Sequence, residues 1–235
     1  MTVSEVMAEL QGYGSERVKK IWLKHGIKEP FFGVKIDDLK KIQKKVKTDN
    51  ELAKGLFATG NADAMYLAGL ITDDKKMTKA DLNTWAKQAL SSNISEYTVP
   101  WVAAGNNDGY ELALEWIDSA DEHVAASGWA TLGGWMATHA DSELDLSALL
   151  QLMQRVLNTI KSSPDRVRYQ MNNFMIHAGT YVVELTDEAI NMAKQMGKIT
   201  VIKEGTVCKT PDAIEYIMKA KTKSTLGKKK TTMKC

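Results

Sequence analysis

Apolar residues recur at intervals of three and four along almost the whole chain, the spacing that places them on one face of an α-helix. Val3, Val6, Met7 and Leu10 show this pattern at the start of the chain. The same spacing predicts helices over residues 3–10, 18–22, 36–42, 52–57, 64–71, 82–89, 97–104, 110–117, 124–137, 149–160, 166–185, 189–197 and 211–221. Segment 124–137 is apolar on most sides, which predicts a buried central helix.

The predicted helices are separated by short loops. Only four prolines occur in 235 residues, and Pro30, Pro100 and Pro164 stand at predicted helix boundaries. Helix pairs that each span about 35–45 residues are typical of a HEAT-like helical-repeat solenoid. The sequence therefore predicts an all-α fold of this type, an α-α superhelix, with a compact non-repeat bundle as the alternative.

The pattern changes after residue 197. Residues 198–202 read KITVI, and the turn-like KEGT follows at 203–206, so a short hairpin or an extended arm is expected. Pro211 and Asp212 then open a last helix. We predict a HEAT-like repeat domain over 1–197, an extended arm and terminal helix packed on the same domain over 198–221, and a basic tail over 222–235.

Charge is distributed unevenly along the chain. The net charge is +2, yet residues 219–235 hold seven lysines and no acid, which leaves −5 for the remainder. A basic tail on a mildly acidic body is typical of a protein with a polyanionic partner, most often nucleic acid. A frayed end that only improves solubility is the alternative.

Composition excludes several other classes. Hydrophobic residues make up 44% and charged residues 26%, as in an ordinary globular protein. We expect no membrane span, because no run of about 18 apolar residues occurs. The N-terminus lacks the features of a secretory signal, and Cys208 and Cys235 form no recognisable disulfide framework, so a cytoplasmic location is expected.

Several segments resemble the AlkD-like DNA alkylation repair proteins, a HEAT-like family that includes alkylpurine DNA glycosylases. They are EPFFGVKIDDLKKI at 29–42, AMYLAGLI at 64–71, WIDS at 116–119, PDRVRYQMNNFMI at 164–176 and GTVCKTPDA at 205–213. The last two look like a divergent bacterial branch of the family. This resemblance implies a concave channel that faces DNA.

The resemblance also implies where catalytic residues would stand. Active glycosylases of the family place an Asp shortly after a Trp on one helix, an Arg on the next inner helix, and a further Trp beyond. The matching segment, NISEYTVPWVA at 93–103, holds no aspartate, and Val99 or Pro100 falls at the position of the acid. Ala126 stands near the place of the arginine, and Ile176 or His177 at that of the second Trp. The usual catalytic set is therefore not matched.

One carboxylate at another position remains a candidate for catalysis, because it could stabilise an oxocarbenium-like sugar or position water. Glu96 and Asp108 are the candidates. Glu96 precedes Tyr97 and stands near Trp101, and these aromatics are candidate DNA contacts. Trp101 is expected to be partly exposed, since it follows Pro100 at a helix start. A solvated acid beside core aromatics is the alternative interpretation.

Arg166 and Arg168 stand near a helix N-terminus after a proline, where guanidinium and backbone N–H groups together suit a phosphate. The two side chains diverge by about 200° on a helix, so one is expected to face the channel while the other pairs with an acid. Asp165, Arg168 and Asn172 share one face, as a DNA contact or as a polar network between helices.

Lysines of the tail add candidate phosphate contacts that depend on salt: Lys228, Lys229 and Lys230. His177 is interpreted as a core or capping residue, because no second His or Cys stands at metal-ligand spacing from it, and we expect neither a metal nor a cofactor. Cys208 beside Lys209 is interpreted as part of a structural arm rather than as a reactive thiol.

Three functional hypotheses follow. The first is a DNA-binding protein of the DNA alkylation repair family, binding duplex or damaged DNA without the usual catalytic residues. The second is an active alkylpurine DNA glycosylase with a relocated carboxylate. The third is a helical-repeat scaffold for a protein partner, which the acidic body favours.

Overall fold

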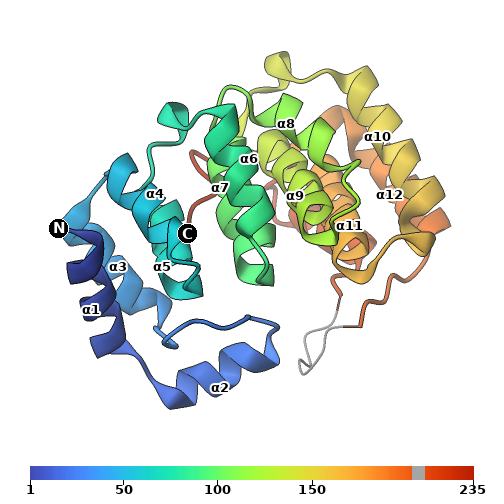
Figure 1. The fold of residues 1–235 in the computed structure, drawn as a ribbon. Helices are drawn as coiled ribbons and strands as arrows, with labels where there is room; N and C mark the ends of the chain where they lie inside the picture. The colour runs from blue at the N-terminus through green and yellow to red at the C-terminus, as the bar shows by residue number, and fades with distance from the viewer. Residues whose placement is uncertain (203–209) are drawn as a thin grey trace.

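The chain folds into an arc of paired helices, shown in Figure 1. The computed structural model describes residues 1–202 and 210–235. The α-helices are α1 (Val3–Tyr13), α2 (Glu16–Lys24), α3 (Ile36–Val46), α4 (Asn50–Ala58), α5 (Ala62–Ile71), α6 (Lys79–Gln88), α7 (Val99–Ala104), α8 (Gly109–Trp116), α9 (Glu122–Thr138), α10 (Leu146–Thr159), α11 (Asp165–Tyr181), α12 (Thr186–Met196) and α13 (Ala213–Thr222). Short helical turns are η1 (Asp74–Lys76), η2 (Ile94–Thr98), η3 (Asp141–Glu143), η4 (Ile160–Ser162) and η5 (Val183–Leu185).

Two hydrophobic clusters run through the arc. One joins α1, α3, α4, α5, α6 and α7, and the other joins α9, α10, α11, α12 and α13. Helix α9 lies at the centre, packed against α7, α8 and α11. Trp129 and Leu132 of α9 are fully buried, which confirms the predicted central helix. Every residue of α5 is buried as well, because small side chains allow neighbouring helices to approach closely.

The inner helices α5, α7, α9 and α11 point in one direction. The backbone N–H of Arg166, at the start of α11, donates to Glu122 at the start of α9 (2.8 Å). Loop 25–34 joins the starts of two further elements, since Lys28 N–H donates to Ser91 Oγ (2.8 Å) ahead of η2, and Ala62 N–H to Pro30 O (2.9 Å) ahead of α5. We call these N-terminal ends with loop 25–34 the N-terminal rim, and the opposite ends the C-terminal rim.

The basic tail runs along the C-terminal rim. Gly227 N–H donates to Thr180 O of α11 (2.9 Å), and Lys230 N–H to Ala137 O of α9 (2.7 Å). Lys234 Nζ reaches Thr72 O, just after α5 (2.5 Å). These bonds satisfy carbonyl groups that a helix leaves unpaired at its C-terminus, where a cation is also favourable. The interpretation of this tail as a frayed end is therefore wrong.

Two other details depart from the sequence expectations. The predicted helix 166–185 is interrupted after Tyr181, with η5 following it. Residues 198–202 form no helix, and no β-strand occurs within the described ranges. The rest of the predicted hairpin, at 203–206, and Cys208 lie outside the described residues. No helix in those ranges is long and apolar enough to cross a membrane.

Candidate nucleic-acid interface

The turn η2 carries Glu96 and Tyr97 on the concave side of the arc. It is a π-type turn, closed by Val99 N–H donating to Ile94 O. Pro100 has no N–H to offer the carbonyl of Glu96, so the regular α-helical ladder cannot run through this position. Wider turns of this type often occur at functional sites, because they redirect side chains.

Arg166 joins η2 to α11. Its Nε lies 3.0 Å from Glu96 Oε1, and its two Nη atoms donate to Leu90 O (3.2 Å) and to Ser95 Oγ. The Glu96 side chain is 5% exposed and that of Arg166 24%. Gln170 Nε2 donates to the second carboxylate oxygen of Glu96 (2.9 Å). Both oxygens of Glu96 therefore have donors, and the candidate acid and the candidate phosphate ligand form one ion pair.

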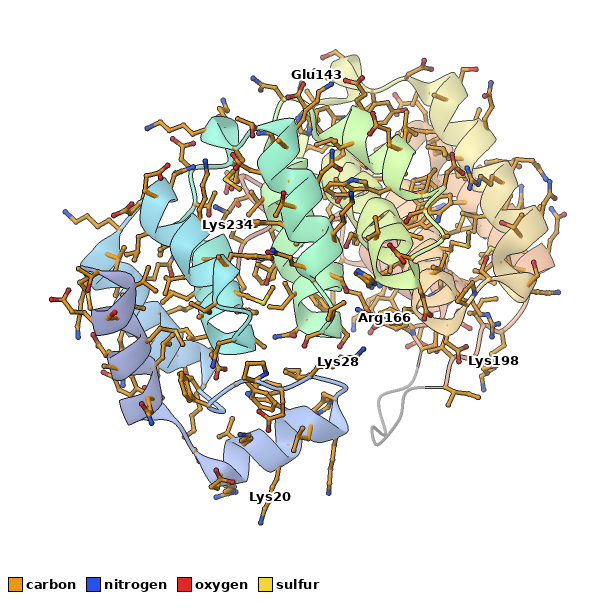
Figure 2. All side chains as sticks on the ribbon, viewed as in Figure 1. Lys20, Lys28, Glu143, Arg166, Lys198 and Lys234 are labelled. Atoms are coloured by element: carbon orange, nitrogen blue, oxygen red, sulfur yellow. The ribbon has the colours of Figure 1, made fainter. Side chains whose placement is uncertain are left out.

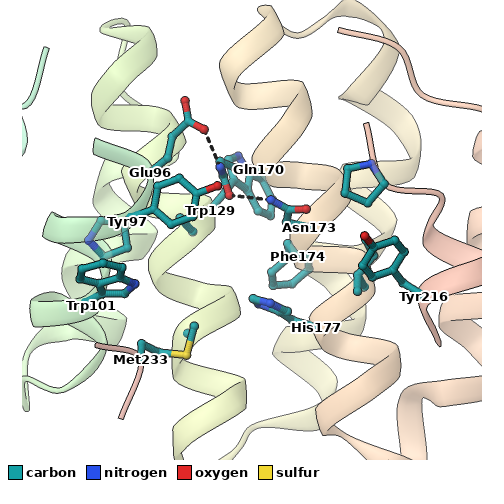
Figure 3. Close-up of a pocket in the computed structure, with 15 residues that line it drawn as sticks. Glu96, Tyr97, Trp101, Trp129, Gln170, Asn173, Phe174, His177, Tyr216 and Met233 are labelled. Atoms are coloured by element: carbon teal, nitrogen blue, oxygen red, sulfur yellow. Dashed lines mark hydrogen bonds between the residues drawn. The ribbon is translucent and has the colours of Figure 1, made fainter. Parts of the chain in front are cut away.

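A pocket of about 220 Å³ lies beside this network. Figure 3 shows Glu96, Gln170 and Asn173 linked in a row at one end and His177 nearer Met233 at the other. The residues that line it are Glu96, Tyr97, Pro100, Trp101, Trp129, Ala130, Gly134, Gln170, Asn173, Phe174, Ile176, His177, Pro211, Tyr216 and Met233. Aromatic walls and amide groups suit a flat, hydrogen-bonding group better than a compact anion.

His177 forms part of the floor of the pocket. Burial, together with the charge of Lys230, lowers the pKa of His177 to about 4. Its ring packs so closely on α9 that a Cβ added to Gly133 would lie 2.4 Å from Nδ1. The ring is therefore neutral at pH 7 and fits the expected role of a core histidine.

The other predicted contacts on α11 are used inside the protein. Arg168 pairs with Asp165 (3.2 Å), as the shared face predicted, and donates to four carbonyl groups, among them Thr200 O (3.1 Å) of the arm. Asn172 is 1% exposed and donates to Pro211 O (2.9 Å). Both side chains hold the arm that precedes α13. The expectation that only one of the two arginines pairs with an acid is therefore wrong, because Arg166 pairs with Glu96.

The predicted aromatic contacts differ in exposure. Tyr97 is 44% exposed, whereas Trp101 is only 8% exposed, so the expectation of a partly exposed Trp101 is wrong. Trp101 is covered by edge-to-face contacts with Tyr66 (5.3 Å between ring centroids) and Tyr97 (6.3 Å). Asp108 lies beyond the end of α7, where Lys79 approaches it to 3.7 Å. It does not belong to the pocket.

The three predicted tail lysines lie at the C-terminal rim. Lys229 pairs with Asp141 (2.7 Å) and donates to Met136 O (2.8 Å). Lys230 stands over the ring of Tyr181, 5.8 Å from its centroid, and is exposed, as is Lys228. Lys229 therefore has partners within the protein, while Lys228 and Lys230 also face solvent.

Exposed lysines also stand at the N-terminal rim, beside the N-termini of the inner helices. Figure 2 shows Lys28, Arg166 and Lys198 along this rim, whereas Lys20 projects from the outer side of α2, away from them, and Lys234 and Glu143 lie farther away. Lys20, Lys28 and Lys198 are exposed and make no ion pair with the residues that the structure describes.

Several acids of the same rim have partners within the protein, although Asp121, at the N-cap of α9, is exposed and makes no capping bond. Glu96 is paired with Arg166, and Glu122 accepts the backbone N–H of Arg166. Asp63 accepts the N–H groups of three consecutive residues from Phe32 to Val34 (2.7, 3.0 and 3.3 Å). Burial nevertheless raises the pKa of Asp63, because it opposes the charged form more than these bonds support it. Helix N-termini add partial positive charge along the rim.

Sequence reasoning missed Gln170 and Asn173. Both follow Arg166 on the helix and turn toward η2, Gln170 at i+4 from Arg166 and Asn173 three residues further on. The i, i+4 relation between Arg166 and Gln170 was visible in the sequence, but their common partner, Glu96, lies 70 and 74 residues away.

The arc of paired helices with a pocket on its inner face defines a HEAT-like helical-repeat protein. The family model described as DNA alkylation repair enzyme matches residues 6–217. The chain belongs to the DNA alkylation repair family, which confirms the resemblance found in the sequence.

Similar proteins cover nearly the whole chain. A solved structure, reported as belonging to a new family of proteins related to the HEAT-like repeat DNA glycosylases with affinity for branched DNA structures, is 35% identical. It covers 100% of both chains with a TM-score of 0.92, which confirms the HEAT-like fold. Uncharacterised proteins of Listeria innocua serovar 6a and Listeria monocytogenes serovar 1/2a are 33% and 31% identical. These matches cover 94% and 95% of this chain and 98% and 99% of the relatives.

Proposed function

We propose that this protein binds branched DNA across the N-terminal rim and does not excise bases. The observation that carries the proposal is the set of exposed lysines on this rim, which make no ion pair with the described residues and stand beside helix N-termini, while Glu96 and Glu122 are engaged with Arg166. Such a surface attracts phosphates without reading sequence. The solved relative with affinity for branched DNA supports a junction rather than a plain duplex as the preferred ligand.

The absence of base excision is inferred from Glu96. A catalytic carboxylate has to face the sugar or a water molecule as charge develops. Both oxygens of Glu96 instead accept hydrogen bonds from Arg166 and Gln170, and the side chain is 5% exposed. We expect no release of methylated base from alkylated DNA, either by the natural protein or by Glu96→Gln. Release by the natural protein that is lost in Glu96→Gln would overturn this part of the proposal.

Binding is tested with a pair of charge reversals. Lys28→Glu lies on the N-terminal rim, and Lys75→Glu is its control, since Lys75 is exposed, makes no ion pair with the described residues and belongs to η1 at the opposite rim. Fluorescence anisotropy of a labelled three-way junction is measured over a series of salt concentrations. Losing a phosphate contact should reduce the slope of log K against log salt by about one.

Lys28→Glu is expected to weaken binding severalfold and to reduce the salt slope, with Lys75→Glu close to the natural protein. A protein that does not bind any junction or duplex at low salt would overturn the proposal. Capture of a protein partner that resists nuclease would then favour the scaffold hypothesis.

A further inference from the structure

A second pocket, of about 200 Å³, lies next to the first, on the other side of Tyr97 and Trp101. It opens between α2 and the inner helices. The residues that line it are Trp22, Ile27, Val34, Ile36, Leu39, Asp63, Tyr66, Asn93, Tyr97 and Trp101. Four of these are aromatic, and the rest are mainly aliphatic.

The protein's own side chains leave this space open. Ile27, Phe31 and Ala62 form a small hydrophobic cluster with Trp22, separate from the main cluster that contains Val34, Leu39, Tyr66 and Trp101. The pocket lies where the two clusters face each other. Apolar walls that face a gap lose the dispersion contacts that close packing would provide, so a flat apolar group would gain them by entering.

One polar atom in the pocket lacks a partner. Asn93 stands at the N-cap position of η2, yet its side chain makes no capping bond. Its Oδ1 is buried and accepts no hydrogen bond within the described residues. A buried acceptor without a donor is costly, and an asparagine at a helix start normally uses this oxygen to cap. Because Asn93 lines the pocket, a small rotation of its side chain would present this acceptor to a ligand with an N–H group.

Positive charge stands at the same place. The backbone of Lys28 is joined to Ser91, two residues before Asn93, and the lysine side chain is exposed without an ion pair to the described residues. A ligand with a flat ring, an N–H donor and a nearby phosphate meets all three features. An unstacked nucleotide has these groups, and aromatic side chains bind its base by stacking.

We propose that this second pocket receives one unpaired nucleobase with an amino group, presented at the branch point of a DNA junction. The proposal rests on the proposed function, and it adds a physical basis for distinguishing branched DNA from a duplex. In a duplex every base is paired and stacked, so inserting one into the pocket costs the free energy of unpairing and unstacking it. A base at a branch point is already largely unpaired or unstacked, so its insertion costs less.

The test compares three-way junctions that carry adenine or an abasic residue at each branch nucleotide in turn. An abasic residue inside a duplex arm serves as the control for flexibility. For the natural protein, removing the bound base should weaken binding by about 5- to 150-fold, the contribution of stacking one base on aromatic side chains. The abasic residue in the arm should change little.

Two variants alter the pocket in different ways. Ile36→Phe fills it, and Asn93→Leu removes the acceptor while keeping an apolar wall. Both should lose most of the difference between adenine and abasic junctions, and both should bind the abasic junction as the natural protein does. Ala130→Leu, which fills the first pocket instead, should keep the difference. Thermal unfolding checks that each variant is folded.

The possible outcomes are separable. Equal binding of adenine and abasic junctions by the natural protein would overturn the proposal that the second pocket binds a base, and would leave the proposed function intact. Loss of the difference in Ala130→Leu alone would place the base in the first pocket and refute the proposal. Failure to bind any junction would overturn both proposals.

Discussion

Replacing Arg166 with methionine would remove the cation of the ion pair and leave its partner in place. Glu96 would then keep one side-chain donor, Gln170, in a site where its side chain is 5% exposed. A buried charge without its counter-ion is the costly case, because neither water nor protein replaces the lost stabilisation. Arg166→Met should therefore destabilise the protein far more than a substitution that removes an exposed charged side chain.

The size of the effect follows from burial. Breaking a buried pair by removing one partner costs about 3–5 kcal/mol. For a chain of 235 residues this corresponds to a fall in Tm of roughly 6–20 °C. The matched control is Arg155→Met, whose pair with Asp118 (2.6 Å) has side chains 38% and 67% exposed. Arg155 also donates to Ile117 O (3.4 Å) and lies over the Trp129 ring. Exposed pairs contribute only about 0.2–1 kcal/mol.

The assay is urea unfolding of four proteins: the natural chain, Arg166→Met, Glu96→Gln and the double variant. Once Glu96 is neutral, losing Arg166 should cost much less, so the double variant should be more stable than the sum of the two changes predicts by about 1.5 kcal/mol or more. Additive losses, or a loss in Arg166→Met no larger than in Arg155→Met, would refute the buried-pair reasoning.

Three further predictions follow from the C-terminal rim and the floor of the first pocket. Lys234→Met should destabilise by about 2–4 kcal/mol, and adding Asp74→Asn should restore part of the loss in urea unfolding, because the two side chains pair at 2.6 Å and are 15% and 18% exposed. Gly133→Ala should cost about 1–3 kcal/mol by pressing its Cβ on the His177 ring, and His177→Ala should relieve that cost in the double variant; an equal loss in both backgrounds would contradict this contact. The pKa of His177, lowered to about 4, means that the unfolded chain takes up its proton near pH 6.5 while the folded chain does not, so stability should fall between pH 6.5 and 4. Between pH 7 and 5 the free energy of unfolding of the natural protein should fall by about 1–2 kcal/mol more than that of His177→Gln. Parallel pH profiles of the two proteins would show that burial does not lower the pKa of His177.

Local pattern was sufficient for most of the helices and not for the tail. The spacing of apolar residues predicted α9 and the break at Pro164, because both depend on neighbours within a few residues. The path of residues 227–234 depends on unpaired carbonyl groups at the ends of α5, α9 and α11. No pattern inside the tail reveals these groups, so the sequence indicates only the positive charge of its lysines.

The candidate site shows the same division. Glu96 and Arg166 were each singled out from local features, one beside aromatic residues and the other near a helix N-terminus. That they neutralise each other could not be inferred, since 70 residues separate them and their contact depends on the register of η2 against α11. Trp101 was expected to be exposed for a similar reason: the rings of Tyr66 and Tyr97 that cover it meet it only in the folded arc.

The tail has a consequence for the order in which the molecule is completed during translation. Residues 227–234 leave the ribosome after helices α1 to α13, yet Lys234 binds beside α5 and Lys230 at the end of α9. The inner helices of the nascent arc can form early. The carbonyl groups at the C-terminal ends of α5, α9 and α11 obtain their hydrogen bonds only when residues 227–234 have been synthesised. Synthesis that stalls shortly before residue 227 would therefore yield a nearly complete but weakened arc, which cellular proteases would encounter first at the C-terminal rim.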